Sequence, residues 1–566
     1  MISRRNTSLA YASSVLGFLP GKALHVHNLK SSRRNALALV AFAYAASMIG
    51  FLPGISLYGH ELKQRLQLTQ TDLLQIAGVQ NLTGIFGAVM GVVAQQLGVR
   101  GSIICGGLLA AAAQTAQYAL ALHLFNIPAF APFVILQVLA RCGLMVADAS
   151  AFAIPVALFQ KQRAMVSAIM TCFISGSVAL SAQVSQLLEE GAGVPLGGLL
   201  FWPFWSLAVS LCAAMVLPEN LLSEKEGHDA SCEASEQLLN IKSSQNDISL
   251  EGEGRADIVN FMFLVLAVFG SFSVLRSIGT ILPGVASLHL TFQYGIIASF
   301  LFPIFFFCFQ NVFGCIRGCL AHLSRASQTV EAPRQLSCLE MLRTVDAWLW
   351  LITVAFVYSG SQVFTSNAGE ITRSAGAAGD FHKVVATVWS SGVTFGSLLS
   401  PILSDVLVSK GLPRTMLPFL SSFLAGGGHT LLASAAHLAA KGPLLLSGAF
   451  SIGMAMGTMT VQTGVVVCEL FGKSHLVVNN AFYSGICHGP IPYVFMLLAG
   501  AMFDRHSASQ GRECVGPECF SVMHSIMIVG NLAGAISALI LSARTAKIYG
   551  GVACCSTASL PKIAGG

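Results

Sequence analysis

The chain has 566 residues and a net charge of +6; 54% of its residues are hydrophobic and only 10% are charged. A soluble protein carries roughly 25% charged residues, because a folded surface in water needs them. The composition therefore excludes an ordinary soluble enzyme or nucleic-acid-binding protein, and the mean hydropathy of +0.71 excludes a disordered chain. These observations predict a membrane protein with many spans.

Apolar windows recur along the chain with a length of about 20 residues, which a helix needs to cross the ~30 Å hydrocarbon core. They predict an all-α membrane protein of about 14 spans, in groups of six, two and six. The first six are 35–58, 73–95, 101–124, 128–152, 164–188 and 197–217. The two extra spans are 258–282 and 294–316, and the last six are 346–368, 383–408, 413–437, 442–468, 476–502 and 520–544.

The segments around these spans set the predicted domain organisation. The acidic segment 218–257 has ten acids, three bases and no aromatic residue, which predicts a disordered cytosolic linker. The segment 1–34 has six bases and no acid, which suits a cytosolic tail or an organelle transit peptide. The predicted units are a basic cytosolic tail 1–34, an N-terminal six-helix bundle 35–217, the linker 218–257, two extra spans with a basic loop 258–345, a C-terminal six-helix bundle 346–544 and a cytosolic tail 545–566.

Lysine and arginine are distributed unevenly between alternate loops. With the N-terminus in the cytosol, 22 of the 31 lie in cytosolic segments, seven on the opposite face and two within spans. Cytosolic loops of membrane proteins are enriched in these residues. We therefore expect both termini in the cytosol, in a plasma membrane, an endomembrane or an organelle membrane. Because the bases are scattered through short loops, anionic lipid is a better partner for them than nucleic acid.

Several motifs, in this order and spacing, resemble the nodulin-like family of the major facilitator superfamily. The motifs of the first half are Tyr58–Gln70, Asn81-Leu-Thr-Gly84, Phe159-Gln-Lys-Gln-Arg163 and Ser175-Gly176. Those of the second half are Asn367-Ala-Gly-Glu370, Lys410-Gly-Leu-Pro-Arg414, Glu469-Leu-Phe-Gly472, Gly500-Ala-Met-Phe-Asp504-Arg505 and Cys514–Phe520. The resemblance covers most of residues 35–549. It implies two six-helix bundles around a central cavity and a role in solute transport, without fixing the solute.

One signature of that superfamily is a loop after the second span that reads Gly-x3-Asp-x2-Gly-x-Arg. Gly91, Gly98 and Arg100 match it, but Gln95 replaces the acid. The related loop of the second half keeps an acid, Asp405, and a base, Arg414, at a different spacing. The replacement of the acid by Gln95 argues against a charged contact at this loop of the first half. It does not argue against the fold.

Asp148 is the only carboxylate well inside a predicted span, and Arg141 precedes it by seven residues, or two helical turns. Charges at this depth face the protein interior and pair, because isolation in lipid is costly. One interpretation is a proton-coupling carboxylate beside a cation that holds an anionic solute. The other is an internal ion pair that fixes the fourth span to its neighbours. Seven residues is long for a direct bridge, so each side chain can have another partner.

The thirteenth predicted span contains His488, Pro490 and Pro492 within Ser484-Gly-Ile-Cys-His-Gly-Pro-Ile-Pro-Tyr493. Each proline removes a backbone donor, and the freed carbonyls need protein or water as partners. Discontinuous helices of this kind often form transporter sites, so we expect this stretch to line a cavity. His488 is either a proton sensor that titrates near neutral pH or a hydrogen-bonded packing residue.

Other polar residues have two interpretations each. Asn81 in the second span makes a helix–helix hydrogen bond or faces a cavity. Asn367 and Glu370 gate entry at the end of the ninth span, or simply form a polar helix end. Cys514 and Cys519, in the last extracytosolic loop, are spaced for a small disulfide loop if that compartment is oxidising.

The sequence has no GxxxxGK[ST] phosphate loop, no metal-hydrolase motif and no Gly-x-Ser-x-Gly elbow. We therefore expect no enzymatic activity, no cofactor and no metal. The leading hypothesis is a monomeric secondary active transporter of a small organic solute, such as a monocarboxylate or an amino acid, working by alternating access with or without protons. The alternative is a non-transporting receptor or scaffold on the same fold that binds partners through the acidic linker. A channel is a weaker third hypothesis, since no ring of filter residues is present.

Overall fold

The computed structural model describes the following parts of the chain. They are 37–51, 54–125, 130–159, 162–217, several residues between 259 and 275, 289–306, 335–377, 381–438, 441–472, 476–510 and 514–549. The basic tail 1–34, the acidic linker 218–257 and most of the tail 545–566 lie outside the described residues. Within these segments every regular element is a helix, as the apolar windows predict.

The helices of the first part of the chain follow the first six predicted spans. They are η1 (Met48–Phe51), α3 (Ile55–Arg65), α4 (Gln70–Leu82), η2 (Thr83–Phe86), α5 (Gly87–Ala121), α6 (Phe130–Leu158), α7 (Arg163–Gln186), η4 (Leu187–Gly191) and α8 (Gly197–Val216). We call residues 37–217 the N-terminal half.

The helices of the second part follow the last six predicted spans. They are α13 (Cys338–Leu342), α14 (Val345–Ser374), α15 (Phe381–Ser409), α16 (Met416–Ala435), α17 (Lys441–Phe471), α18 (Leu476–His488), α19 (Pro490–Gln510), η7 (Pro517–Cys519), α20 (Ser521–Thr545) and η8 (Ala546–Tyr549). We call residues 335–549 the C-terminal half. Between the halves the structure describes α11 (His289–Phe306).

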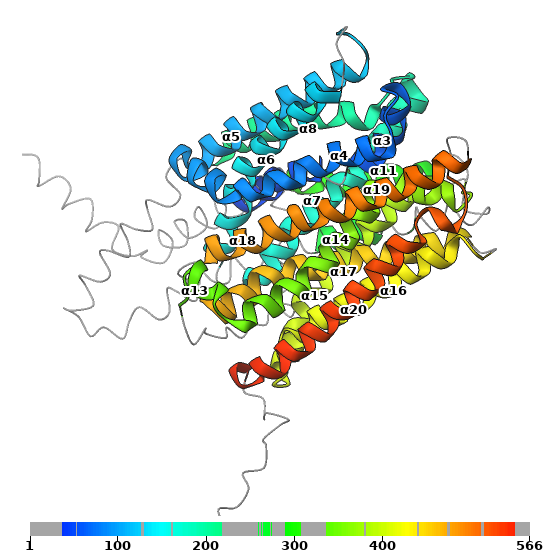
Figure 1. The fold of residues 1–566 in the computed structure, drawn as a ribbon. Coiled ribbons are helices and arrows are strands. Elements are labelled where there is room, and N and C mark those ends of the chain that lie inside the picture. Colours follow the sequence, from blue (N-terminus) through cyan, green and yellow to red (C-terminus); the bar gives the residue numbers. More distant parts are fainter. Residues whose placement is uncertain are drawn as a thin grey trace, which may run out of the picture.

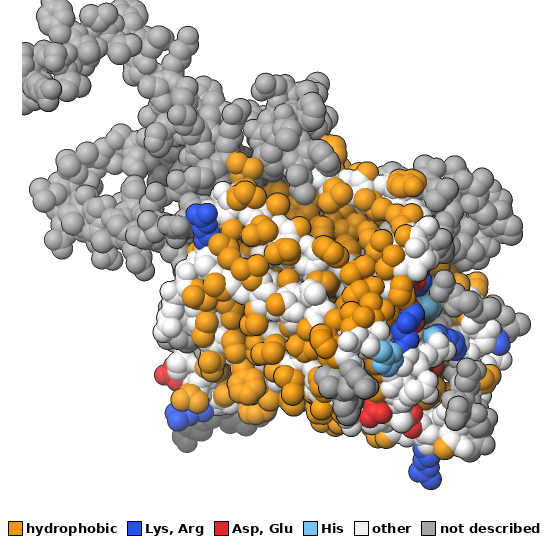
Figure 2. Space-filling model, turned by 90° about the horizontal axis from the view of Figure 1, so that it is seen from above, with side chains coloured by type: hydrophobic (Ala, Val, Ile, Leu, Met, Phe, Trp, Pro, Cys, Tyr) orange, Lys and Arg blue, Asp and Glu red, His pale blue; other side chains and the backbone are white. Residues whose placement is uncertain are grey.

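Ten stretches of helix in the described chain are long and apolar enough to cross a membrane. They coincide with the third to sixth and the ninth to fourteenth predicted spans. Figure 2 shows hydrophobic side chains over most of one face of the molecule and charged side chains toward its margins, as a lipid-facing surface requires. These are the features of an all-α, multi-pass membrane protein.

The first two predicted spans differ from single long helices. The described part of the first is a shorter apolar helix, Leu37–Phe51. In the second, the 3₁₀ turn η2 separates α4 from α5, and α5 itself is kinked at Gly98, whose φ is +70°. Only glycine adopts that angle readily. One residue of the predicted signature loop is therefore the kink that separates the second span from the third.

The two halves pack face to face along one surface, which we call the seam (Figure 1). Helix α4 packs against α19, α3 against α14, and α7 against α15 and α17. Near the middle of the seam the backbones touch: a Cβ on Gly84 would lie 3.1 Å from the Gly485 carbonyl oxygen. Small residues let helices approach this closely in membranes. The seam brings together residues that are hundreds of positions apart.

The segments between the halves pack against both of them. The Tyr44 hydroxyl donates to the Phe300 carbonyl oxygen of α11 at 2.6 Å, and a Cβ on Gly176 of α7 would meet the Phe300 ring. A Cβ on Gly270 would lie 3.3 Å from the ring of Phe395 on α15. The extra segments therefore cover the α7–α15 side of the seam.

The loop after α15 is held by a buried arginine. Arg414, only 1% exposed, donates from Nε to Glu469 Oε1 at 2.8 Å and from Nη1 to Asp405 Oδ1 at 2.9 Å and Ser404 Oγ at 2.5 Å. The Tyr549 hydroxyl donates to Glu469 Oε2 at 2.6 Å. Two motifs of the second half, around residues 414 and 469, thus form one charged cluster.

Candidate functional site

The candidate site begins on one face of α6. Gln137, Arg141 and Asp148 are spaced by four and seven residues, so all three project from the same side of the helix. Arg141 and Asp148 are partly exposed as residues, but Arg141 Nε and Nη1 and Asp148 Oδ1 are enclosed and have no hydrogen-bond partner in the described chain. The charges act on each other electrostatically, although no ion pair between them closes the gap. The two side chains are therefore close enough to interact electrostatically, but they do not form a salt bridge.

His488 lies across the seam from Arg141. It ends α18 and lies within electrostatic range of the Arg141 charge. The His488 ring centroid is 3.9 Å from that of Tyr358 on α14. The Tyr358 hydroxyl is 3.3 Å from Thr460 Oγ1 and 3.5 Å from Thr463 Oγ1, both on α17. The Arg141 charge in one half thus lies within electrostatic range of a cluster that joins three helices of the other half, α14, α17 and α18.

The helix break at the prolines stands next to this cluster. Helix α18 ends at His488 and α19 begins at Pro490, with Gly489 between them. A Cβ on Gly489 would lie 3.1 Å from the Asn81 carbonyl oxygen of α4. Pro492 is buried and Pro490 is partly exposed. The break therefore lies at the seam, where it places His488 opposite α6.

A chain of glutamines joins the α6 face to α4 and α5. The Gln137 amide donates to Gln80 Oε1 at 2.5 Å, and the Gln117 amide donates to Gln137 Oε1. All three are buried, and together they join α4, α5 and α6. Neither this chain of glutamines nor Tyr358 was predicted from the sequence. Three amides inside apolar windows were the available signal for the glutamines.

The other predicted residues lie elsewhere on the seam. Asn81 Nδ2 donates to Met496 Sδ at 3.6 Å, which joins α4 to α19. Asn367 and Glu370 lie on α14, which continues to Ser374, so they do not end the helix as the sequence suggested. Asn367 Oδ1 accepts from Gln70 Nε2 at 3.0 Å. Both residues form contacts between the halves.

Cys514 and Cys519 are joined by a disulfide. Both are buried, at 4% and 1% exposure. Within the loop that they close, the Gly516 amide donates to the Ser374 carbonyl oxygen at 2.9 Å. The loop therefore satisfies one of the free carbonyls that every helix end leaves, here on α14.

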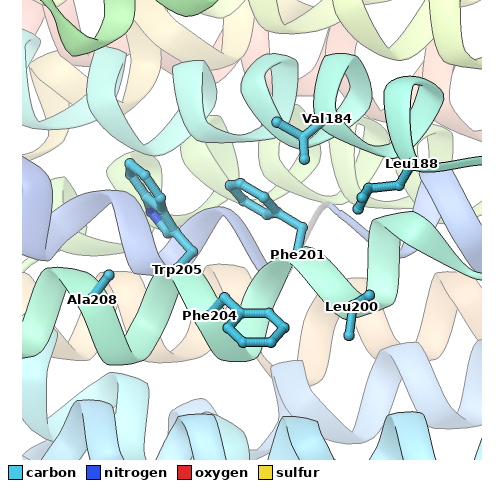
Figure 3. Close-up of a pocket in the computed structure, with 7 residues that line it drawn as sticks. All are labelled: Val184, Leu188, Leu200, Phe201, Phe204, Trp205 and Ala208. Carbon is cyan, nitrogen blue, oxygen red and sulfur yellow. The ribbon is translucent and has the colours of Figure 1, made fainter. Parts of the chain in front are cut away.

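A separate pocket lies between α7 and α8. Figure 3 shows that its lining is apolar and includes the aromatic rings of Phe201, Phe204 and Trp205. It is lined by Val184, Leu188, Leu200, Phe201, Phe204, Trp205 and Ala208. With no polar group to orient a charged or hydrogen-bonding solute, this pocket is a poor candidate for the solute site.

Comparison with known families gives one match. Residues 334–551, which run from just before α13 to just past η8, are similar to the family described as NFD4, C-terminal domain. No curated protein matches the chain. The match coincides with the C-terminal half, which supplies His488, Tyr358, Asn367 and Glu370 to the seam.

Proposed function

We propose that the protein is a secondary active transporter that moves a small organic solute by alternating access. In this proposal the halves are the two six-helix bundles of a major facilitator fold, in a chain of about 14 spans that belongs to the nodulin-like family. Both termini face the cytosol, the chain acts as a monomer in lipid, and it has no enzymatic activity. The sequence motifs between residues 58 and 520 support the family, and the two-part packing supports the layout.

The observation that carries the proposal is the set of enclosed, unpartnered charged atoms on α6. An uncompensated charge in a low-dielectric interior is costly and is retained at functional positions. Arg141 offers a planar guanidinium that suits a carboxylate or another small oxyanion. In the proposed mechanism the solute's anionic group binds Arg141, and Asp148 takes up the coupling proton.

The position of these charges suits alternating access. Arg141 lies on the N-terminal half while His488 and Tyr358 lie on the C-terminal half. A solute between them contacts both halves, so its binding free energy depends on how the halves are placed relative to each other. That dependence is what a rocking mechanism uses.

The test is counterflow in proteoliposomes that contain the purified full chain. Labelled monocarboxylates, amino acids and sugars are compared with and without a pH gradient. We expect saturable counterflow of one class of organic acid or amino acid. A pH gradient should make this counterflow faster or increase the accumulation of the labelled solute. No counterflow across the panel, from protein that elutes as a folded monomer, overturns the proposal and favours the receptor or scaffold hypothesis.

A further inference from the structure

One end of the seam is joined by polar and charged contacts between the halves. This is the end where α3 stops, α4 starts and α14 and α19 stop, and it carries the disulfide loop. The residues concerned are His60, Lys63, Gln70, Thr71 and Glu189 of the N-terminal half and Asn367, Glu370, Lys383 and Asp504 of the C-terminal half. We call these nine residues the latch.

Glu370 is the centre of the first set of contacts. Its Oε1 atom lies 3.4 Å from His60 Nδ1, 3.3 Å from Lys63 Nζ and 3.5 Å from Arg373 Nη1. Lys63 also donates to Gln70 Oε1 at 3.2 Å and lies 5.0 Å from the Phe503 ring centroid. One carboxylate oxygen of the C-terminal half thus accepts from Lys63 and lies within ion-pair distance of His60, both of the N-terminal half, and Arg373 Nη1 also donates to His60 Nδ1.

Asp504 forms the second set, at the start of α4. Its Oδ1 accepts from the backbone N–H of Gln70 at 3.1 Å. Its Oδ2 accepts from the backbone N–H of Thr71 at 2.9 Å and from the Thr71 hydroxyl at 2.5 Å. The first amides of a helix have no partner within the helix, and a carboxylate there also interacts favourably with the helix dipole. The partner here comes from the opposite half.

The third contact lies on the other side of the seam. Lys383 Nζ, at the start of α15, is 2.6 Å from Glu189 Oε2, just past the end of α7. Glu189 Oε1 also accepts from Ser185 Oγ at 2.8 Å and from the Gly197 amide at 3.1 Å. Contacts between the halves therefore join both the α4–α19 side and the α7–α15 side of the seam at the same end.

We propose that the latch keeps this end of the seam closed and that it must break for solute to pass there; the inference rests on the transport function proposed above. Its groups are suited to breaking, because each can be hydrated once the halves separate at an aqueous end, whereas the same contacts deeper in the membrane would lose their partners. Loss of any latch carboxylate then shifts the population toward states open at this end.

The experiment measures access to a cysteine behind the latch. Ser366 lies on α14 one turn before Glu370, partly buried at the seam, with Oγ 3.9 Å from Met496 Sδ. Ser366→Cys is introduced into the full chain in proteoliposomes of uniform orientation. A membrane-impermeant maleimide is added on the side of the disulfide loop, and labelling of the chain without this cysteine is subtracted.

We expect Glu370→Gln and Asp504→Asn each to speed labelling at least about threefold, and Glu370→Asp to have a smaller effect. The matched control is Asp346→Asn, which removes a carboxylate that pairs with Arg544 within the C-terminal half and should leave the rate unchanged. Equal labelling rates in all variants overturn the latch. If Glu370→Gln does not elute as folded protein, Lys63→Gln tests the same contact from the other half.

This measurement needs no known solute, so it separates the two proposals. Faster labelling of the Glu370→Gln and Asp504→Asn variants, with no counterflow by the parent chain, supports the latch and overturns the proposed transport function. Counterflow with unchanged labelling supports transport and removes the latch.

Discussion

Arg414 and Arg141 are both enclosed arginines, but their surroundings are opposite. The Arg414 guanidinium makes ion pairs with Glu469 and Asp405 at 2.8 and 2.9 Å, while two nitrogens of Arg141 have no partner in the described chain. Burial by itself therefore does not indicate what a charged side chain does. The partners of Arg414 are supplied by the fold, whereas the unpartnered nitrogens of Arg141 are the groups that the proposed transport function uses.

The electrostatics of Arg414 support its structural role. Burial works against its charge, but the carboxylates of Glu469 and Asp405 outweigh this effect and hold the pKa of Arg414 above its usual value. The cluster also includes the Tyr549 hydroxyl. Since the ordinary pKa of arginine already lies far above neutral, Arg414 stays charged in this cluster at neutral pH.

The largest effect that we expect is on stability, from Arg414→Gln. The change leaves the Glu469 carboxylate buried without its cation, and removing one partner of a buried pair typically costs about 3–5 kcal/mol. This loss of stability is measured as the change in the free energy of unfolding of the purified chain in detergent. Arg544→Gln is the control, because Arg544 is exposed and pairs with Asp346; such pairs contribute less than about 1 kcal/mol. Equal losses in both variants would contradict the comparison.

Arg141→Gln should affect transport rather than folding. Loss of a hydrogen-bonded charge contact costs up to about 3 kcal/mol, so we expect counterflow to fall by about a hundredfold, equivalent to about 2.7 kcal/mol. Arg141→Lys keeps the charge but not the planar guanidinium and should recover part of the rate. A loss of folded protein with no change in the rate per folded molecule would instead show that Arg141 is structural.

Asp148→Asn has a narrower expected effect. If Asp148 takes up the coupling proton, the neutral amide removes the stimulation by a pH gradient. Counterflow at equal pH should stay within about twofold of the parent rate, because exchange needs no net proton movement. Parallel measurements with and without the gradient separate these outcomes, and an unchanged response to pH would exclude Asp148 from coupling.

Tyr549→Phe should have the smallest effect. It removes one hydrogen bond to Glu469, worth about 1 kcal/mol, and leaves the Arg414 ion pairs in place. The same unfolding measurement applies. A loss as large as that of Arg414→Gln would mean that the hydroxyl, and not the arginine, organises the cluster.

The sequence predicts those features of the structure that depend on local composition. Ten of the predicted spans coincide with long apolar helices, because the length of an apolar window is a local property. The break of the second span at Thr83–Phe86 was missed, since a single turn of this kind hardly changes the apolar pattern. The kink at Gly98 lies in the loop that the sequence predicts between the second and third spans.

The site was predictable only in part. Asp148 and Arg141 could be found because charges inside apolar windows are rare. Their lack of partners depends on side chains that face them from other helices, which one sequence does not reveal. The same is true of Glu370, whose partner Lys63 is 307 residues away along the chain, and of Tyr358, an ordinary aromatic residue in an apolar window.

The close contact between Gly84 and Gly485 also constrains how the chain can vary. A Cβ on Gly84 would lie 3.1 Å from the Gly485 carbonyl oxygen, and one on Gly485 would lie 2.8 Å from the Gly84 carbonyl oxygen. Neither backbone can retreat alone, because each belongs to a packed helix of a different half. Across related sequences, a larger residue at either position should therefore be accompanied by a shift of the facing helix, so that two positions 401 residues apart evolve as a pair.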